Sequence, residues 1–92
     1  MDISKTLKEI ITMKILNNEV FGQNIQKIRI SKNLTQEETV AQLQTMGSPL
    51  SRSTYSLIEL GRGNIFVSDL VGLQKIFRVD FEEFFENIST AR

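Results

Sequence analysis

Few side chains in this sequence can do covalent or acid-base chemistry. The 92 residues include no histidine and no cysteine, so the commonest general base, the thiol nucleophile and the usual ligands of transition metals are absent. Glu82, Glu83 and Glu86 cluster near the C-terminal end. Their spacing lacks the alternating oxygen ligands and the glycine of a calcium-binding loop, and we interpret them as a solvated helix face. We therefore expect no enzyme, no catalytic residue, no metal site and no cofactor.

Hydrogen-bonding side chains are concentrated in residues 51–64, in the run SRSTYSLIELGRGN. The guanidinium group of Arg52 can donate two hydrogen bonds, and O6 and N7 of guanine form a matching pair of acceptors. Ser53 and Ser56 can bond to bases or phosphates, and they are equally compatible with a solvated helix surface. The glycines on either side of Arg62 lack the rest of a phosphate-binding fingerprint, so they predict the end of a helix.

These side chains need a scaffold, and the hydrophobic periodicity of the chain predicts helices throughout. Apolar residues recur at intervals of three and four, and no segment shows the strict alternation of a strand. The segments with this pattern are residues 20–31, about 36–46, about 52–60, 68–77 and 81–85. A further apolar stripe at Ile3, Leu7, Ile10 and Ile11 predicts a helical segment at the N-terminus.

Residues that favour helix ends separate the predicted helices. The predicted N-terminal caps are Thr35 with Glu38, Ser51, Ser68 with Asp69, and Asp80 with Glu83. Gly61 can end the helix of residues 52–60 by adopting the left-handed conformation. Residues 47–49, a Gly-Ser-Pro run, cannot continue the helix before them.

The runs FGQNIQKIR, LTQEE, SRSTYSLIELGRGN and VSDLVGLQKIFRVDFEEFF, in this order, resemble the lambda-repressor-like helix-turn-helix regulators. This is the Cro and phage-repressor class, also called the XRE family. The resemblance covers residues 20–86 and implies an all-α fold, a compact five-helix DNA-binding domain, which we place at residues 19–88. Residues 1–18 then form an extra N-terminal helical segment. Residues 44–50 give the connection between the second and third helices more residues than a tight helix-turn-helix has.

The resemblance implies that the helix of residues 52–60 lies in the major groove of double-stranded DNA. Tyr55 and Ile58 mark its inward side. The expected DNA-binding residues are Gln36, Ser51, Arg52, Ser53, Ser56, Leu57, Arg62 and Asn64. Arg29 and Glu59 match family positions that form an internal ion pair, so we assign these two residues to structure.

The expected DNA-binding residues have different roles. Arg52 can contact a guanine or a phosphate, and the resemblance implies that Gln36 contacts a phosphate or a side chain of the reading helix. Arg62 and Asn64 match the family's phosphate-binding turn, where backbone amides freed by the two glycines add donors. Leu57 can meet a thymine methyl group or belong to a protein-binding patch.

The charged residues are unevenly distributed along a chain of zero net charge. Residues 21–78 carry seven basic and four acidic side chains, whereas residues 79–92 carry four acidic and one basic. We expect the acidic end to face away from DNA. Because a net charge of three is a weak electrostatic footprint, we predict a homodimer on a palindromic site. Its interface can be the N-terminal stripe or the aromatic residues Phe81, Phe84 and Phe85.

These observations predict sequence-specific binding to double-stranded DNA by a transcriptional regulator, a repressor that acts as a homodimer on a palindromic operator. A second interpretation is a protein-interaction module, such as an antitoxin or partner-binding regulator, with weak or no DNA binding. Zero net charge and the outward positions of Leu57 and Leu60 favour it. The N-terminus lacks the apolar run of a signal peptide, and no stretch approaches the roughly 20 apolar residues of a membrane span, so we expect a cytoplasmic protein.

Overall fold

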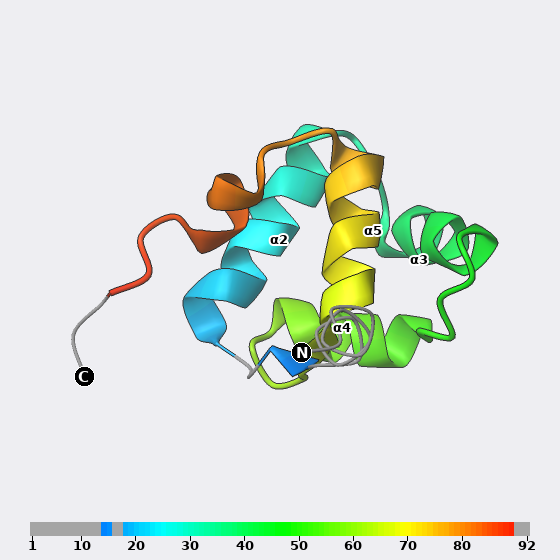
Figure 1. Cartoon of the computed structure of the whole chain (residues 1–92), viewed down its shortest axis with the longest axis horizontal. Helices are drawn as coiled ribbons and strands as arrows, with labels where there is room; N and C mark the ends of the chain where they lie inside the picture. Colours follow the sequence, from blue (N-terminus) through cyan, green and yellow to red (C-terminus); the bar gives the residue numbers. More distant parts are fainter. Residues whose placement is uncertain (1–13, 16–17, 90–92) are drawn as a thin grey trace, which may run out of the picture.

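The computed structural model describes residues 14–15 and 18–89, and most of the predicted N-terminal helical segment lies outside them. The elements in chain order are β1 (Lys14–Ile15), α2 (Glu19–Ser31), α3 (Gln36–Thr45), α4 (Arg52–Glu59), β2 (Ile65–Phe66), α5 (Val67–Phe77) and the 3-10 helix η1 (Phe81–Phe85) (Figure 1). The predicted helices of about 36–46 and 52–60 therefore correspond to α3 and α4.

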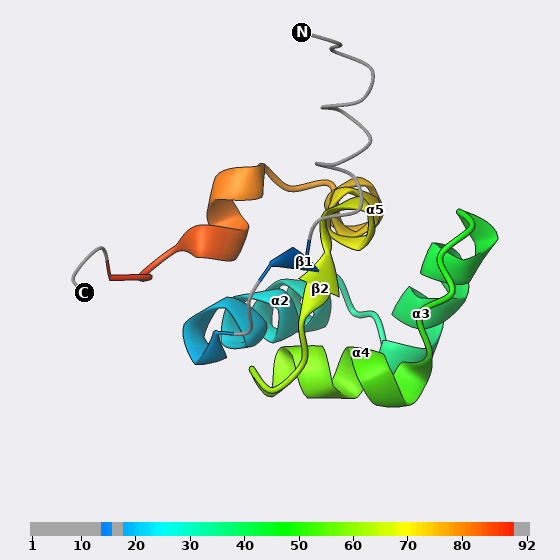
Figure 2. The ribbon, with the colours of Figure 1, turned by 60° about the horizontal axis from the view of Figure 1, so that its bottom comes forward.

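The helices pack around α4 and α2. Helix α4 packs against both α2 and α3, α3 also packs against α5, and η1 packs against α2. Figures 1 and 2 show η1 and α4 on opposite sides of α2. This arrangement separates the acidic end of the chain from the outer face of α4.

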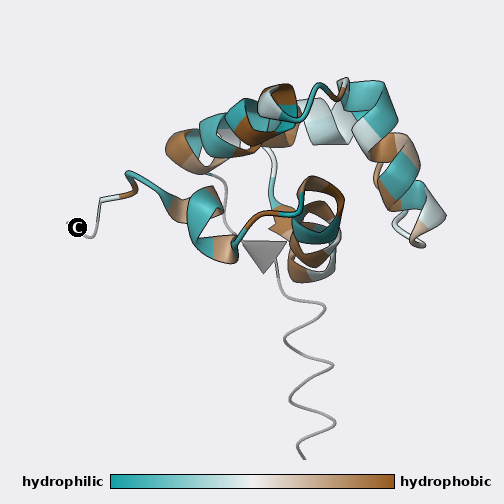
Figure 3. Ribbon diagram, turned by 90° about the horizontal axis from the view of Figure 1, so that it is seen from above, coloured by the Kyte–Doolittle hydropathy of each residue, from teal (hydrophilic) through white to brown (hydrophobic). Residues whose placement is uncertain are grey.

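One hydrophobic core joins all the described helices. Its buried residues are Phe21, Ile25, Ile28, Val40, Leu43, Leu50, Tyr55, Ile58, Ile65, Leu70, Leu73, Phe77, Val79 and Phe84. Most of them recur at three- or four-residue intervals, so each helix turns one side inward. Figure 3 shows hydrophobic residues concentrated on α5, while hydrophilic residues cover much of the helices around it.

Two glycines let α2 and α4 approach closely. A Cβ atom at Gly22 would lie 2.5 Å from the backbone oxygen of Ile58 and 2.6 Å from that of Glu59, so only glycine fits between the two backbones. Gly61 has a φ of +75° directly after α4, which confirms the predicted helix end, and a Cβ there would lie 2.5 Å from the Cα of Glu19.

The connection between α3 and α4, residues 46–51, is longer than a tight turn but is held by hydrogen bonds. The side chain of Gln44 donates to the backbone oxygen of Leu50 at 3.0 Å, and the Ser48 hydroxyl accepts from the Leu50 amide at 3.1 Å. Leu50 itself is buried. The extra residues therefore leave α4 packed on α2 and α3.

The predicted caps at the starts of α3 and α4 are confirmed, and Asp80 is the N-cap residue of η1, but its predicted capping box with Glu83 is not formed. Thr35 and Glu38 form a reciprocal capping box, and the Ser51 hydroxyl accepts from the Thr54 amide. The Asp80 side chain makes no cap hydrogen bond; its backbone oxygen accepts from the Glu83 amide instead.

The predicted cap of α5 at Ser68 is also wrong. Helix α5 begins at Val67, and its N-cap residue is Phe66, without a side-chain cap. The reason is that β2 leads directly into the helix. Asp69 lies in the first turn of the helix, as expected, and is buried there.

An antiparallel pair of two-residue strands was not predicted. Lys14 pairs with Phe66, and Ile15 pairs with Ile65. Two residues are too short to show alternation in the sequence, and the pairing joins segments about fifty residues apart. The mostly helical fold agrees with the all-α prediction apart from this pair.

The described residues form four α-helices rather than the five predicted. The fifth is the 3-10 helix η1, which has five residues and ends before Asn87, where φ is +63°. Its three phenylalanines differ in burial, although the ring of Phe85 also packs against Phe21 of the core, with 5.4 Å between the ring centroids. Phe84 is fully buried, whereas Phe81 and Phe85 are 43% and 44% exposed.

Candidate nucleic-acid interface

The outer face of α4 carries four of the eight residues expected to bind DNA. Tyr55, Ile58 and Glu59 are the buried residues of this helix. Arg52, Ser53 and Leu57 are exposed, and Ser56 is partly exposed. The helix thus presents polar groups and one leucine to solvent along the side opposite the core.

Four of the expected residues meet at one open hollow between α3 and α4. Gln36, from the first turn of α3, lines it together with Arg52, Ser53 and Ser56 from α4, and its volume is about 400 Å³. The α3 and α4 N-termini lie close together here because the two helices pack on each other. The hollow joins donors and acceptors from two helices on a single surface.

The amide of Gln36 is oriented by a buried carboxylate. Its Nε2 donates to Oε1 of Glu59 at 3.0 Å. Because an ionised carboxylate only accepts hydrogen bonds, the nitrogen must face Glu59. The resemblance implies that Gln36 contacts either a phosphate or a side chain of the reading helix. Its bond to Glu59 of α4 is a contact of the second kind.

Glu59 is held in turn by Arg29, as predicted. The guanidinium donates from Nε at 2.7 Å and from Nη2 at 3.0 Å to the two carboxylate oxygens, and its Nη1 donates to the backbone oxygen of Leu34. Only 11% of the Arg29 side chain and 2% of the Glu59 side chain are exposed. The hydrogen bond to Glu59 raises the pKa of Arg29, so the guanidinium keeps its positive charge.

The hydroxyl of Tyr55 belongs to the same buried region. Burial, with a further contribution from the negative charge of Glu59, raises the pKa of Tyr55. Tyr55 therefore remains neutral at physiological pH. On the inner side of α4, Tyr55 thus lies beside the hydrogen-bonded pair of Arg29 and Glu59, while its own hydroxyl has no hydrogen-bond partner among the described residues.

Arg52 forms an ion pair that the sequence analysis missed. Its Nη1 donates to Oε1 of Glu37 at 3.1 Å, and both side chains are largely exposed. Glu37 directly follows Gln36 in the first turn of α3, so a helix-turn-helix brings it near the start of α4. The position of Glu37 beside Gln36 is the signal in the sequence that could have predicted this ion pair.

Ser51 occupies a capping position and not the hollow. Its hydroxyl accepts from the Thr54 amide at 3.2 Å, donates to the Thr54 hydroxyl and lies 3.2 Å from the Ser53 hydroxyl. These bonds fix the first turn of α4. Ser51 must exchange one of them to contact a ligand.

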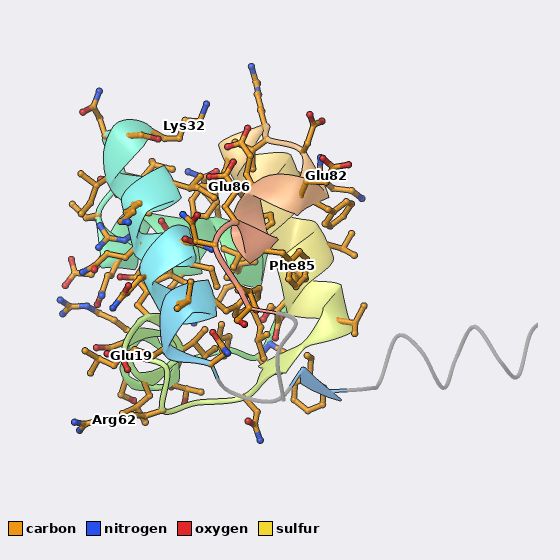
Figure 4. The ribbon with its side chains drawn as sticks, turned by 90° about the vertical axis from the view of Figure 1, so that its left-hand side faces the viewer. Glu19, Lys32, Arg62, Glu82, Phe85 and Glu86 are labelled. Atoms are coloured by element: carbon orange, nitrogen blue, oxygen red, sulfur yellow. The ribbon has the colours of Figure 1, made fainter. Side chains whose placement is uncertain are left out.

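Arg62 and Asn64 lie beyond the C-terminal end of α4, away from the hollow. The Arg62 side chain is exposed and points outward near the start of α2 (Figure 4). The prediction that backbone amides are available here is wrong for Arg62 and Gly63, because both amides donate to the backbone oxygen of Leu57, at 2.9 and 3.1 Å. Any anion contact at Arg62 must come from its side chain.

The acidic side chains near the C-terminal end lie far from Arg62. Figure 4 shows Glu82 and Glu86 around Phe85, at the opposite end of the view from Arg62. The surface around α4 is therefore separated from this negative charge.

Comparison with solved structures finds a similar protein. No family model matches the chain, and no curated protein matches it. The crystal structure of the restriction-modification controller protein C.AhdI from Aeromonas hydrophila is similar, with a TM-score of 0.63 and 25% sequence identity. The match covers 73% of this chain and 94% of that chain.

This chain has a lambda-repressor-like helix-turn-helix fold. Helices α3 and α4 form its helix-turn-helix, and the hollow lies across their N-terminal ends. Within residues 14–15 and 18–89, no helix is long and apolar enough to cross a membrane.

Proposed function

We propose that this protein is a transcriptional regulator that binds double-stranded DNA in a sequence-specific manner, and that it acts as a homodimeric repressor on a palindromic operator. The observation that carries this proposal is the hollow in which Gln36, Arg52, Ser53 and Ser56 meet. In helix-turn-helix proteins, this part of the second helix of the pair lies in the major groove.

Arg52 is the residue with the most specific chemistry in this proposal. Its guanidinium stands at the first position of α4, where reading helices contact base edges. A bidentate contact to guanine discriminates by roughly 1–3 kcal/mol. Ser53, Ser56 and Leu57 add smaller contacts to bases or to thymine methyl groups.

Contacts to phosphate position the reading helix. Gln36 at the start of α3 and Ser51 at the start of α4 flank the groove contacts, and Arg62 with Asn64 extends beyond the far end of α4. Such contacts fix orientation but carry no sequence information. The similarity to a restriction-modification controller protein supports the proposed function as a DNA-binding regulator.

A homodimer doubles a small set of DNA contacts. Phe81 and Phe85 leave apolar surface exposed on η1, and η1 lies on the opposite side of α2 from α4. A partner that packs there would leave both α4 helices uncovered. Repression then requires only that the dimer occupy a promoter.

A second candidate function is binding to a protein partner. Leu57 and Leu60 are 45% and 57% exposed on α4. Exposed apolar side chains on one helix face favour a protein contact over a charged ligand. An antitoxin or a partner-binding regulator would use this surface.

Selection from a randomised DNA duplex library, followed by sedimentation of the selected complex, tests the proposal. We expect enrichment of a palindromic site and a complex with two protein chains. Transcription from a promoter that contains this site should fall when the protein is present. If no sequence is enriched even at low salt, DNA binding by the protein is contradicted and the partner-binding function takes its place.

A further inference from the structure

The proposed reading unit carries more negative than positive charge. Between residues 36 and 59, Arg52 is the only basic residue, whereas Glu37, Glu38 and Glu59 are acidic. Glu59 is neutralised by Arg29 from α2. The exposed surface of α3 and α4 therefore combines one cation with two carboxylates.

The two exposed carboxylates are used differently. Glu38 bonds back to the backbone amide of Thr35 at 3.0 Å, so it is committed to the cap of α3. Glu37 bonds to Nη1 of Arg52. The only cation of the reading unit is thus paired with a carboxylate at the edge of the hollow.

Magnitudes decide what this pair does in the presence of DNA. An exposed ion pair shifts an equilibrium by up to about fivefold, and a bidentate contact of arginine with guanine discriminates by roughly 5- to 150-fold. Guanine can therefore draw Arg52 from Glu37. A single solvated phosphate offers a contact of about the same strength as the carboxylate, and the charge of Glu37 also repels that phosphate.

We propose that Glu37 is a specificity-determining residue, which lowers the affinity of Arg52 for the phosphate backbone more than its affinity for guanine. This inference rests on the proposed function and adds to it. Glu37 favours the correct base pair because it weakens the contact of Arg52 with phosphate. Repulsion of this kind is a common source of specificity.

The chain offers a matched control in Glu38. Glu37→Gln and Glu38→Gln change the net charge equally and lie in the same helical turn, but only Glu37 touches Arg52. Glutamine at residue 38 can keep the capping box. Any difference between the two variants therefore reports on the pair with Arg52.

The experiment measures dissociation constants of the wild type and both variants on a selected site and on random duplex, over a range of salt concentrations. We expect Glu37→Gln to tighten binding to random DNA by about two- to fivefold relative to Glu38→Gln, the range that corresponds to an exposed ion pair. The tightening on the selected site should be smaller. The slope of log affinity against log salt should steepen by about one for Glu37→Gln only.

A double variant checks that the effect passes through Arg52. In an Arg52→Ala background, Glu37→Gln and Glu38→Gln should give the same affinity for random DNA. Thermal unfolding of each variant confirms that it is folded.

Three results would overturn the inference. If Glu37→Gln matches Glu38→Gln while the wild type selects a site, Glu37 has no special role but the proposed function stands. If Glu37→Gln weakens binding to the selected site, Glu37 supports or reads a contact instead of opposing one. If the wild type binds no DNA, the proposed function and this inference fail together.

Discussion

Two arginine–glutamate pairs involve residues of α4, and they differ in burial and in hydrogen bonding. Arg29 and Glu59 are buried and joined by two hydrogen bonds. Arg52 and Glu37 are joined by one bond of 3.1 Å, with 60% and 73% of their side chains exposed. One pair lies on the inner side of the helix and the other at the edge of the hollow.

The difference shows how environment sets the role of the same chemical group. A buried pair is costly to break because the remaining charge loses both water and its partner. An exposed pair exchanges freely with solvent and other ligands. We therefore assign Arg29 and Glu59 to the fold, whereas the roles that we propose for Arg52 and Glu37 are in recognition.

The largest expected effect comes from breaking the buried pair. Glu59→Ala should lower the free energy of unfolding by about 3–5 kcal/mol, because Arg29 is left charged and buried and Gln36 loses its acceptor. Urea denaturation measures this loss. A decrease below about 1 kcal/mol would mean that the buried pair contributes no more than a surface pair.

The close approach of α2 and α4 can be tested without changing any charge. Gly22→Ala places a methyl group against the backbone oxygens of Ile58 and Glu59, and we expect a loss of about 1–3 kcal/mol in the free energy of unfolding. Alanine is otherwise the better helix former. A stabilised variant in the same denaturation experiment would contradict the backbone contact.

The exposed pair should matter little for stability. Arg52→Ala and Glu37→Ala should each change the free energy of unfolding by less than about 1 kcal/mol. Both should be measured beside Glu59→Ala under identical conditions. A loss comparable to that of Glu59→Ala would remove the distinction between the two pairs.

The smallest effect is a pH dependence at the cap of α3. Hydrogen bonds from the backbone and side chain of Thr35 lower the pKa of Glu38 below its ordinary value of 4.5. Ionised Glu38 therefore stabilises the fold above that pH, and this contribution is lost as the pH falls through the lower folded pKa. The difference in Tm between wild type and Glu38→Gln should shrink across this acidic range. A difference that is constant with pH would contradict the ionised cap.

Features set by neighbouring residues could be predicted from the sequence. The Thr35 and Glu38 capping box and the left-handed Gly61 both depend on a few consecutive residues, and both are confirmed. The internal pair of Arg29 and Glu59 required the family resemblance, because thirty residues separate them.

Features set by distant contacts could not be predicted. The pairing of residues 14–15 with 65–66 has no local signal, and α5 begins at Val67 because β2 leads directly into it. The amide of Arg62 is occupied because Leu57 offers its backbone oxygen at the end of α4. At the candidate site, Gln36 was expected beside α4, but the contact of Glu37 with Arg52 depends on how α3 and α4 cross.

The central claim, that Arg52 reads a base, is tested most directly by comparing Arg52→Lys with Arg62→Ala on the selected site and on its single-base variants. Lysine keeps the charge of Arg52 but cannot form the two-bond contact. We predict that Arg52→Lys loses its preference at one base pair in each half-site, by roughly 1–3 kcal/mol, whereas Arg62→Ala weakens binding to all sequences alike. If Arg52→Lys keeps the wild-type preference at every position, Arg52 does not read a base and the account is contradicted.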